Sequence, residues 1–430
     1  MTKLSLIIKN AKQLLTLQSD KKGPRIGEEM QHLGIIEHGA VAIDKAIIVD
    51  VGKTDEILNK YTSENIIDAN GKIVMPGFVD PHTHPIFVQT RENELEMRIK
   101  GKSYKEISQS GGGIRSSINA VRKASLEELV TLAEKRINKM LQQGTTTMEA
   151  KSGYGLSTDS EIKMLRAIEI LNEKSDMDIV PTFLGAHEFP EEYKDNKDKY
   201  IRILVDEMLP EVKRQGLSKY CDIFCESYVY NIDQSRYILG KAKEMGFRIR
   251  MHADELEPTG GAELSAEIGA ITADHLGATS DKGIQAMKRA GVVPILLPGT
   301  TFSLGLDHYA RARDMINAGL AVTLATDYNP GSCNCDSMQF IISLACIQMR
   351  MLPAEAIAAS TINGAYSLEL ADKIGSIEKT KQADIVIMNI PSYQYIPYHL
   401  GSNCVDMVIK KGKTVFRNDN NLELITRVQE

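Results

Sequence analysis

The stretch from Met75 to His84 reads Met-Pro-Gly-Phe-Val-Asp-Pro-His-Thr-His and carries the strongest signal of the architecture. It joins a short apolar run to two histidines, His82 and His84, which lie two positions apart. In an extended segment residues i and i+2 point to the same side, so both imidazoles can face one site. We therefore predict a strand whose carboxyl end presents two potential metal ligands.

Seven more short apolar runs follow this stretch, and helical segments occupy most of the gaps between them. Such alternation is typical of a parallel sheet. Eight strand–helix units spread over about 300 residues predict an α/β fold of the TIM-like (β/α)8 barrel type, which typically takes about 250 residues. The strands are expected at residues 73–79, 145–150, 179–184, 221–225, 247–252, 270–274, 292–297 and 321–326.

Two of the expected helices begin with a capping-box pattern. Ser125 with Glu128 precedes a segment at 126–143 whose apolar residues recur at helical spacing. Thr158 with Glu161 repeats the pattern further along the chain. The connection after the first strand is much longer than the others, so we expect it to form a loop over the barrel mouth.

Both ends of the chain read as short strands. Residues 4–8 and 40–51 are rich in Val and Ile, and 383–389, 405–410 and 414–416 have the same character. Neither end alone has enough strands for a stable sheet, so we expect the two ends to pair. The predicted domains are a β domain made of 1–72 and 375–430 and a barrel at 73–374.

Charge and composition exclude several classes of protein. Lys and Arg total 51 against 57 Asp and Glu, a net charge of −6, so no basic field is present to bind nucleic acid. No apolar segment is long enough to span a membrane, and residues 1–17 do not resemble a signal peptide. Six cysteines in 430 residues do not suggest a disulfide framework, so we expect a cytoplasmic protein.

Two further polar groups occur where predicted strands end. His252 ends the fifth strand, and Asp327 follows the eighth. The carboxyl ends of barrel strands meet at one mouth, so both should approach His82 and His84. Three imidazoles and a carboxylate suit one divalent metal ion with an open position for water.

Two more histidines, His187 and His275, follow the third and sixth strands and should lie on the same rim. A histidine that does not hold metal can move a proton or bind substrate near neutral pH. The alternative is that each one caps a loop or orients a ligand.

Three other patterns leave alternatives open. Lys151, after the second strand, could be a carbamylated metal bridge, but a lysine paired with a nearby carboxylate is the favoured interpretation. Cys333 and Cys335 are interpreted as free thiols because no second Cys or His pair lies at a useful distance. The glycines at 111–113 fit an anion-binding nest or a flexible loop equally well.

Taken together, these motifs resemble the amidohydrolase superfamily, and most closely its branch that acts in histidine degradation. The histidine pair alone marks only the superfamily. The likeness extends over nearly the whole chain and is carried by more specific segments at 111–114, 151–156, 182–187, 252–255, 297–304, 326–332, 382–384 and 393–399.

The resemblance implies a barrel with a small discontinuous β-sandwich, assembled as a homodimer. It implies one zinc or iron ion bound by His82, His84, His252 and Asp327. Substrate-binding roles carry over to Arg91, Tyr154, His187, Glu255, Asn329, Gly331 and Ser332. The acidic stretch at 92–96 departs from the family pattern and is expected not to touch the site.

The implied reaction is hydrolysis of the lactam C–N bond of 4-imidazolone-5-propanoate to N-formimidoyl-L-glutamate. His275, Asp327 and Glu255 are the predicted catalytic residues, and Arg91 matches a propionate carboxylate through its planar fork. Two alternatives stay open: another hydrolase of cyclic amides or nucleobases, and a catalytically silent metal-binding protein.

Overall fold

The computed structural model describes the whole chain except residues 22, 103–105, 107–111 and 419–430. Gly111, part of the possible anion nest, lies outside the described residues. The chain forms two compact units. The first contains residues 1–80, 139–147 and 337–430, and the second contains 81–138 and 148–336. The domain bounds expected from the sequence, 1–72, 73–374 and 375–430, stay a prediction.

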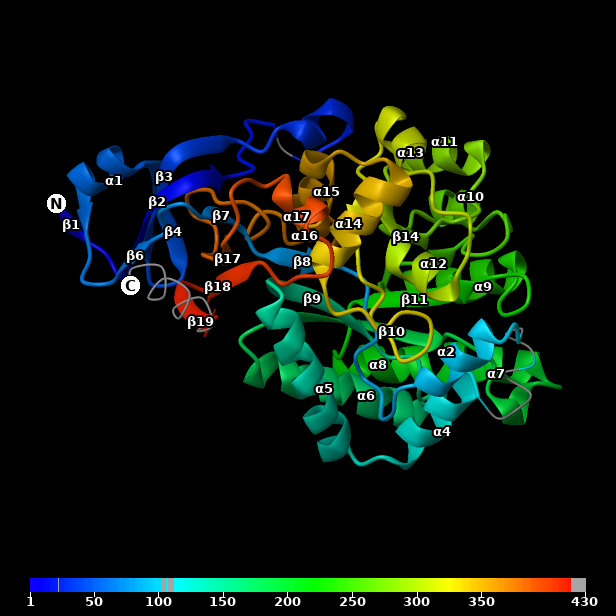
Figure 1. Cartoon of the computed structure of the whole chain (residues 1–430). Coiled ribbons are helices and arrows are strands. Elements are labelled where there is room, and N and C mark those ends of the chain that lie inside the picture. Colours follow the sequence, from blue (N-terminus) through cyan, green and yellow to red (C-terminus); the bar gives the residue numbers. More distant parts are fainter. Residues whose placement is uncertain (22, 103–105, 107–111, 419–430) are drawn as a thin grey trace. The chain divides into compact units, whose positions relative to one another are not determined.

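Strands from both chain ends form one eight-stranded sheet, which confirms the predicted β domain. The C-terminal strands β17 to β19 lie beside the N-terminal strands (Figure 1). The sheet runs in the order β19-β18-β17-β7-β2-β3-β4, and β6 pairs with β2. Its strands are β2 (Leu6–Leu15), β3 (Ile35–Asp44), β4 (Ile47–Lys53), β6 (Ile66–Asp68), β7 (Ile73–Pro76), β17 (Ile385–Met388), β18 (Val405–Lys410) and β19 (Lys413–Arg417). A separate pair joins β1 (Thr2–Lys3) to β5 (Tyr61–Thr62).

Alternation along β2 explains why the sheet has two apolar faces. Leu6 and Ile8 pack into one buried cluster, whereas Ile7 packs into another with Leu4 and Ala40. Successive side chains in a strand point to opposite faces, so an unbroken apolar run covers both sides.

The predicted first strand at 73–79 is wrong as a single strand, because the run divides at Gly77. Its first half, β7, pairs with β2 and β17 in the β domain, and its second half, β8 (Phe78–Asp80), begins the barrel. A Cβ atom at Gly77 would come within 2.3 Å of the Thr146 side chain. Glycine therefore lets the backbone pass at the point where the chain changes sheets.

The second sheet is the predicted barrel. Its strands run parallel in the order β16-β15-β14-β13-β11-β10-β9-β8. The barrel is closed by backbone bonds between its first and last segments, because His84 N donates to Tyr328 O at 2.8 Å and Asp327 N donates to His82 O at 3.1 Å. The strands after β8 are β9 (Thr145–Lys151), β10 (Asp178–Ala186), β11 (Tyr220–Cys225), β12 (Arg248–Ile249), β13 (His252–Ala253), β14 (Thr272–His275), β15 (Val293–Leu296) and β16 (Thr323–Leu324).

Helices separate most of the barrel strands, as expected. In α5 (Leu126–Gln142) the residues Leu129, Ala133 and Ile137 are buried, and Ser125 Oγ accepts a hydrogen bond from Glu128 N. Among the described residues no helix is long and apolar enough to cross a membrane. The other helices are α1 (Thr54–Lys60), α2 (Glu92–Ile99), α4 (Ile114–Lys123), α6 (Thr158–Lys174), α7 (Lys197–Ile203), α8 (Leu209–Gln215), α9 (Ile232–Glu244), α10 (Gly261–Ile268), α11 (Asp281–Ala290), α12 (Pro298–Leu304), α13 (Ala312–Asn317), α14 (Met338–Met349), α15 (Pro353–Ala359), α16 (Ile362–Ser367) and α17 (Tyr395–Tyr398).

Candidate functional site

The two histidines of the 75–84 motif lie side by side after the first barrel strand. Their Nε2 atoms are 3.3 Å apart, and Asp327 Oδ1 lies 3.5 Å from each of them. An ion bound tetrahedrally at about 2.1 Å separates its nitrogen and oxygen ligands by about 3.4 Å. The triangle therefore has the dimensions of three ligands around one metal ion.

His252, at the start of β13, supplies a fourth group. Its ligand atom lies within 4.8 Å of those of His82 and His84. His252 Nε2 is buried and has no hydrogen-bond partner among the residues that the structure describes. A buried polar nitrogen without a partner is destabilising, and a cation between these groups would remove that cost. The residues present therefore fit a divalent metal ion.

Two carboxylates behind the histidines fix their orientation. Asp274 Oδ2 lies 2.6 Å from His82 Nδ1, and Asp222 Oδ2 lies 3.1 Å from His252 Nδ1. A histidine that donates Nδ1–H to a carboxylate presents the lone pair of Nε2 on its other side. The sequence patterns did not identify Asp222 or Asp274. A charged residue inside an apolar strand was the signal that could have found them.

His275 and Asp327 both have left-handed backbone conformations, with φ of 75° and 53°. This region is unfavourable for residues with a Cβ, so the surrounding structure must hold them there. Thr300 Oγ1, which the sequence patterns missed, donates to Asp327 Oδ2 at 2.5 Å. Ligand atoms of His82, His275 and Asp327 lie within 4.8 Å of one another. His275 is therefore close enough to act on the same position as the predicted metal ligands.

Burial governs the protonation of this site. It lowers the pKa of His82, His84 and His275 well below the usual range, and neighbouring cationic groups add to the effect. Burial raises the pKa of Asp327 to about 6 and that of Glu255 to about 8. At neutral pH the three imidazoles are therefore neutral, and Glu255 retains a proton.

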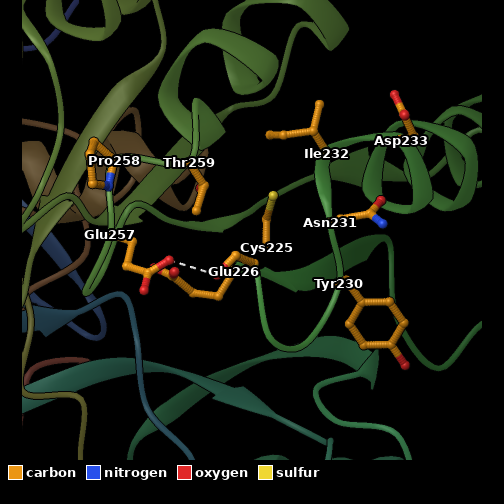
Figure 2. A pocket seen from close by; sticks show the side chains of 10 residues that line it. Cys225, Glu226, Tyr230, Asn231, Ile232, Asp233, Glu257, Pro258 and Thr259 are labelled. Carbon is orange, nitrogen blue, oxygen red and sulfur yellow. Dashed lines mark hydrogen bonds between the residues drawn. The ribbon is translucent and has the colours of Figure 1, made fainter.

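Glu255 lies beside His275, with Oε2 3.7 Å from Nδ1. The backbone next to Glu255 is held by Glu226, a buried residue whose Oε1 accepts a hydrogen bond from Leu256 N at 3.1 Å. Glu226 also lines a separate cavity of about 600 Å³ at the carboxyl ends of β11 and β13 (Figure 2). The rest of its lining comes from residues 225, 227, 230–233 and 257–259, so this cavity is distinct from the cluster of histidines.

Arg91, predicted to bind a substrate carboxylate, is paired with a carboxylate of the protein. Its Nε and Nη2 atoms each donate to Glu94 at 2.8 Å. Glu94 Oε1 also accepts a hydrogen bond from Gly113 N at 2.7 Å. The expectation that the 92–96 stretch does not touch the site residues is wrong, because Glu94 follows Arg91 by about one helical turn.

A buried carboxylate also holds the loop that carries Tyr154. Glu161 Oε1 accepts hydrogen bonds from Gly155 N and Leu156 N, both at 2.8 Å. The predicted capping box of Thr158 with Glu161 is wrong, because this carboxylate binds the preceding loop instead. The loop conformation around Tyr154 therefore depends on Glu161.

His187 connects this loop to the histidines. Its Nδ1 lies 2.9 Å from Gly153 O, and its ring centroid lies 5.3 Å from that of Tyr154. The ring also stacks on His84, with centroids 5.1 Å apart. Burial first, and then repulsion by His252, lowers the pKa of His187 to about 3. His187 is therefore a neutral hydrogen-bonding group beside the metal ligands.

The loop after Asp327 is held by Asn329, whose Oδ1 accepts hydrogen bonds from Gly331 N at 2.8 Å and Ser332 N at 2.7 Å. A Cβ at Gly331 would come 2.4 Å from Arg91 Nη1, so a side chain there would displace the Arg91 guanidinium. Arg98, which the sequence patterns missed, donates from Nη1 to Gly331 O at 3.1 Å. Arg91 and this loop thus form a second group of predicted residues beside the histidine group.

The remaining sequence patterns have simple structural outcomes. Lys151 Nζ donates to Glu149 Oε1 and Asp222 Oδ2, both at 2.7 Å, which agrees with the favoured interpretation of a lysine paired with carboxylates. Burial alone would lower the pKa of Lys151, but the two carboxylates raise it above its usual value. Cys333 and Cys335 are free thiols, as expected.

Sequence comparison relates this chain to known proteins along nearly its full length. The sequence model of the amidohydrolase family matches residues 73–415. The chain is 48% identical over 415 residues to an imidazolonepropionase of Alkaliphilus oremlandii, covering 96% of this chain and 98% of that protein. It is 45% identical over 419 residues to an imidazolonepropionase of Clostridium tetani, covering 97% and 99%.

Solved structures share the fold at much lower sequence identity. An adenosine deaminase of Xanthomonas campestris with bound zinc superposes with a TM-score of 0.71 at 18% identity, covering 99% of this chain and 98% of that one. Guanine deaminase of E. coli gives 0.68 at 15% identity, covering 96% and 99%. Identity this low establishes only that the architecture is shared.

Proposed function

This chain belongs to the amidohydrolase family and, within it, to the imidazolonepropionases, and on that premise we propose how its residues carry out the reaction. The enzyme hydrolyses the lactam C–N bond of 4-imidazolone-5-propanoate, giving N-formimidoyl-L-glutamate in histidine degradation. The observation that carries the proposed mechanism is the triangle of His82, His84 and Asp327, whose edges of 3.3 to 3.5 Å suit one metal ion.

His82, His84, His252 and Asp327 would hold one divalent ion per chain, either zinc or iron. A divalent ion in such a site lowers the pKa of water from about 15.7 to about 7 and polarises a carbonyl oxygen. The neutral imidazoles of His82 and His84 support this assignment, because only an unprotonated nitrogen can be a ligand. At His252 burial lowers the pKa, but the adjacent Asp222 carboxylate raises it above its usual value, so metal binding there would displace a proton.

Proton transfer is assigned to three side chains. With a pKa of about 6, Asp327 is ionised at neutral pH and can accept a proton from the attacking water. His275 can orient that water and stabilise the developing oxyanion. Glu255, with a pKa of about 8, retains a proton that it can donate to the leaving lactam nitrogen.

Arg91 is assigned to the propionate carboxylate of the substrate. Its guanidinium is held in place by Glu94, and a planar guanidinium is the side chain best suited to meet a carboxylate with two parallel hydrogen bonds. Tyr154 and His187 would line the imidazolone ring. The loop that contains Asn329, Gly331 and Ser332 would line the part of the site that binds the propionate group of the substrate.

The wider setting is supported by the family resemblance. We propose a homodimer in the cytoplasm that acts on a small molecule, with no nucleic-acid or membrane partner. The net charge of −6 agrees with the proposed absence of nucleic-acid binding.

The decisive experiment measures loss of the ultraviolet absorbance of freshly made 4-imidazolone-5-propanoate, together with elemental analysis of the protein. We expect turnover, about one metal ion per chain, loss of activity after dialysis against a chelator, and recovery when zinc or iron is returned. Turnover that survives complete metal removal, or two metal ions per chain, would contradict the mechanism.

A further inference from the structure

Five charged side chains are completely buried behind the metal-binding histidines. They come from β9, β11, β14 and the segment between β12 and β13. The set contains two cations and three carboxylates, and such groups are retained in a barrel interior only when they compensate one another. The five residues are Glu149, Lys151, Asp222, Arg250 and Asp274.

Lys151 lies at the centre of this buried charge cluster. Its Nζ donates to Glu149 and Asp222 at 2.7 Å and lies 3.8 Å from Asp274 Oδ2. Arg250 is more peripheral, with Nη1 3.7 Å from Glu149 Oε1. One ammonium group therefore contacts all three carboxylates of the cluster.

Two of these carboxylates are the ones that orient metal-binding histidines. Asp222 lies 3.1 Å from His252 Nδ1, and Asp274 lies 2.6 Å from His82 Nδ1. The ammonium of Lys151 thus fixes two carboxylates from two different strands, and through them two imidazoles. Without it, the carboxylates would lose a common partner and repel each other across the barrel interior.

We propose that Lys151 is a positioning residue for the metal centre: through Asp222 and Asp274 it fixes the directions in which His252 and His82 present Nε2. This inference rests on the proposed metal site, and it assigns Lys151 a role other than that of a carbamylated ligand. It also explains why a charged residue occupies a position with no solvent exposure.

Residue 151 is also anchored through its main chain, so the role of its ammonium group can be tested separately from that anchor. Lys151 N donates to Thr83 O at 3.0 Å, and Thr83 Oγ1 donates to Glu149 O at 2.5 Å. The bond from Lys151 N to Thr83 O uses only main-chain atoms, so it does not require the lysine side chain. A substitution there therefore changes the ammonium without removing this backbone anchor.

The test compares Lys151→Met with Lys410→Met. Lys410 is a matched control because it is also buried and also paired, 2.6 Å from Asp384, but in the β domain. Zinc affinity is measured by competition with a chromophoric chelator, and the coordination geometry is followed by the visible spectrum of the cobalt-substituted protein. We expect zinc affinity to fall about 10- to 100-fold in Lys151→Met with a changed cobalt spectrum, and Lys410→Met to match the wild type in both.

Several outcomes would overturn the inference. Unchanged affinity and spectrum in Lys151→Met would do so, as would equal losses in both variants. Zinc binding that rises with added bicarbonate would indicate a carbamylated ligand instead. If Lys151→Met does not fold, Lys151→Gln and Asp222→Asn replace it, with the same expected loss of affinity. A wild-type protein that binds no metal would overturn the proposed function itself, whereas metal binding insensitive to residue 151 overturns only this inference.

Discussion

Two buried lysines, one in the barrel and one in the β domain, form ion pairs that look alike but differ in what lies beyond them. Lys151 and Lys410 are 0% and 2% exposed, and each donates to a carboxylate at 2.6 to 2.7 Å. The carboxylate beside Lys410, Asp384, also accepts a hydrogen bond from Lys411 N at 3.0 Å. Two of the three carboxylates beside Lys151, Asp222 and Asp274, contact histidines of the site instead.

This difference shows that a buried ion pair must be interpreted through the other contacts of its carboxylates. The pair in the β domain joins the end of β18 and the turn after it to the residue that precedes β17, so its role is confined to the packing of that sheet. The cluster around Lys151 links strands whose side chains converge on a reactive position. Buried ion pairs are in general weak evidence for stability. The cluster around Lys151 therefore needs an explanation other than stability.

The largest predicted effect concerns stability in the β domain. Lys410→Met should lower the free energy of unfolding by about 3–5 kcal/mol, because it leaves the Asp384 carboxylate buried and uncompensated. Adding Asp384→Asn should restore most of the loss while keeping an acceptor for Lys411 N. Thermal unfolding of the single and double variants measures this. A double variant as unstable as the single one would contradict the comparison.

In the barrel, replacing His275 should lower turnover rather than the stability of the fold. His275→Ala should lower kcat by about 100-fold or more while metal content stays at the wild-type level, because His275 orients water and stabilises charge. Steady-state kinetics with elemental analysis distinguishes the outcomes. Loss of metal would place His275 among the ligands, and near-normal turnover would leave it a structural role.

A somewhat smaller effect is expected at the substrate end of the site. Arg91→Lys should lower kcat/KM by about 10- to 150-fold, mainly through KM, since a charge-assisted contact contributes about 1.5–3 kcal/mol and Lys cannot copy the planar fork. Metal content should not change. An analogue with a neutral amide in place of the propionate is the control. Wild type should discriminate strongly against it and the variant much less, and equal discrimination would remove Arg91 from carboxylate binding.

The last predicted effect is a pH-dependent change in stability. Burial raises the pKa of Glu255 from 4.5 to about 8 in the folded protein. Between pH 4.5 and 8 the unfolded chain releases this proton and the folded chain keeps it, so the wild type loses stability as pH rises through that window. In chelator-treated protein, the Tm of Glu255→Gln relative to wild type should rise by at least about 2 °C from pH 5 to pH 8. A difference that does not vary with pH would contradict the raised pKa.

Part of the candidate site could be predicted because its signals are local. Two histidines separated by one residue share a side of an extended segment whatever else the chain does, and His252 and Asp327 follow apolar runs that read as strands. The parallel barrel then brings such strand ends to one mouth. By contrast, Asp222 and Asp274 have no sequence motif, since their partners are 30 and 192 residues away.

Local sequence patterns gave wrong predictions at two places, where tertiary contacts decided the structure. Glu161 matches a capping box three positions after Thr158, yet its carboxylate holds the Gly155 loop, where several backbone N–H groups converge. The run at 73–79 has uniform apolar character, so nothing in its hydropathy marks the change of sheet at Gly77. Only the close approach of Thr146 shows why glycine occupies that position.

The sequence by itself determined the periodicity of strands and helices, the pairing of the chain ends and the identity of the residues at the barrel mouth. These follow from the spacing of side chains along a short stretch of chain. In a strand or a helix that spacing fixes the face to which each side chain points. The tertiary structure alone decided that Lys151 faces two carboxylates and that Glu94 contacts Arg91. The reason is that a buried charge is stabilised by whichever opposite charge folding brings within a few ångströms, and that distance is not encoded in separation along the chain.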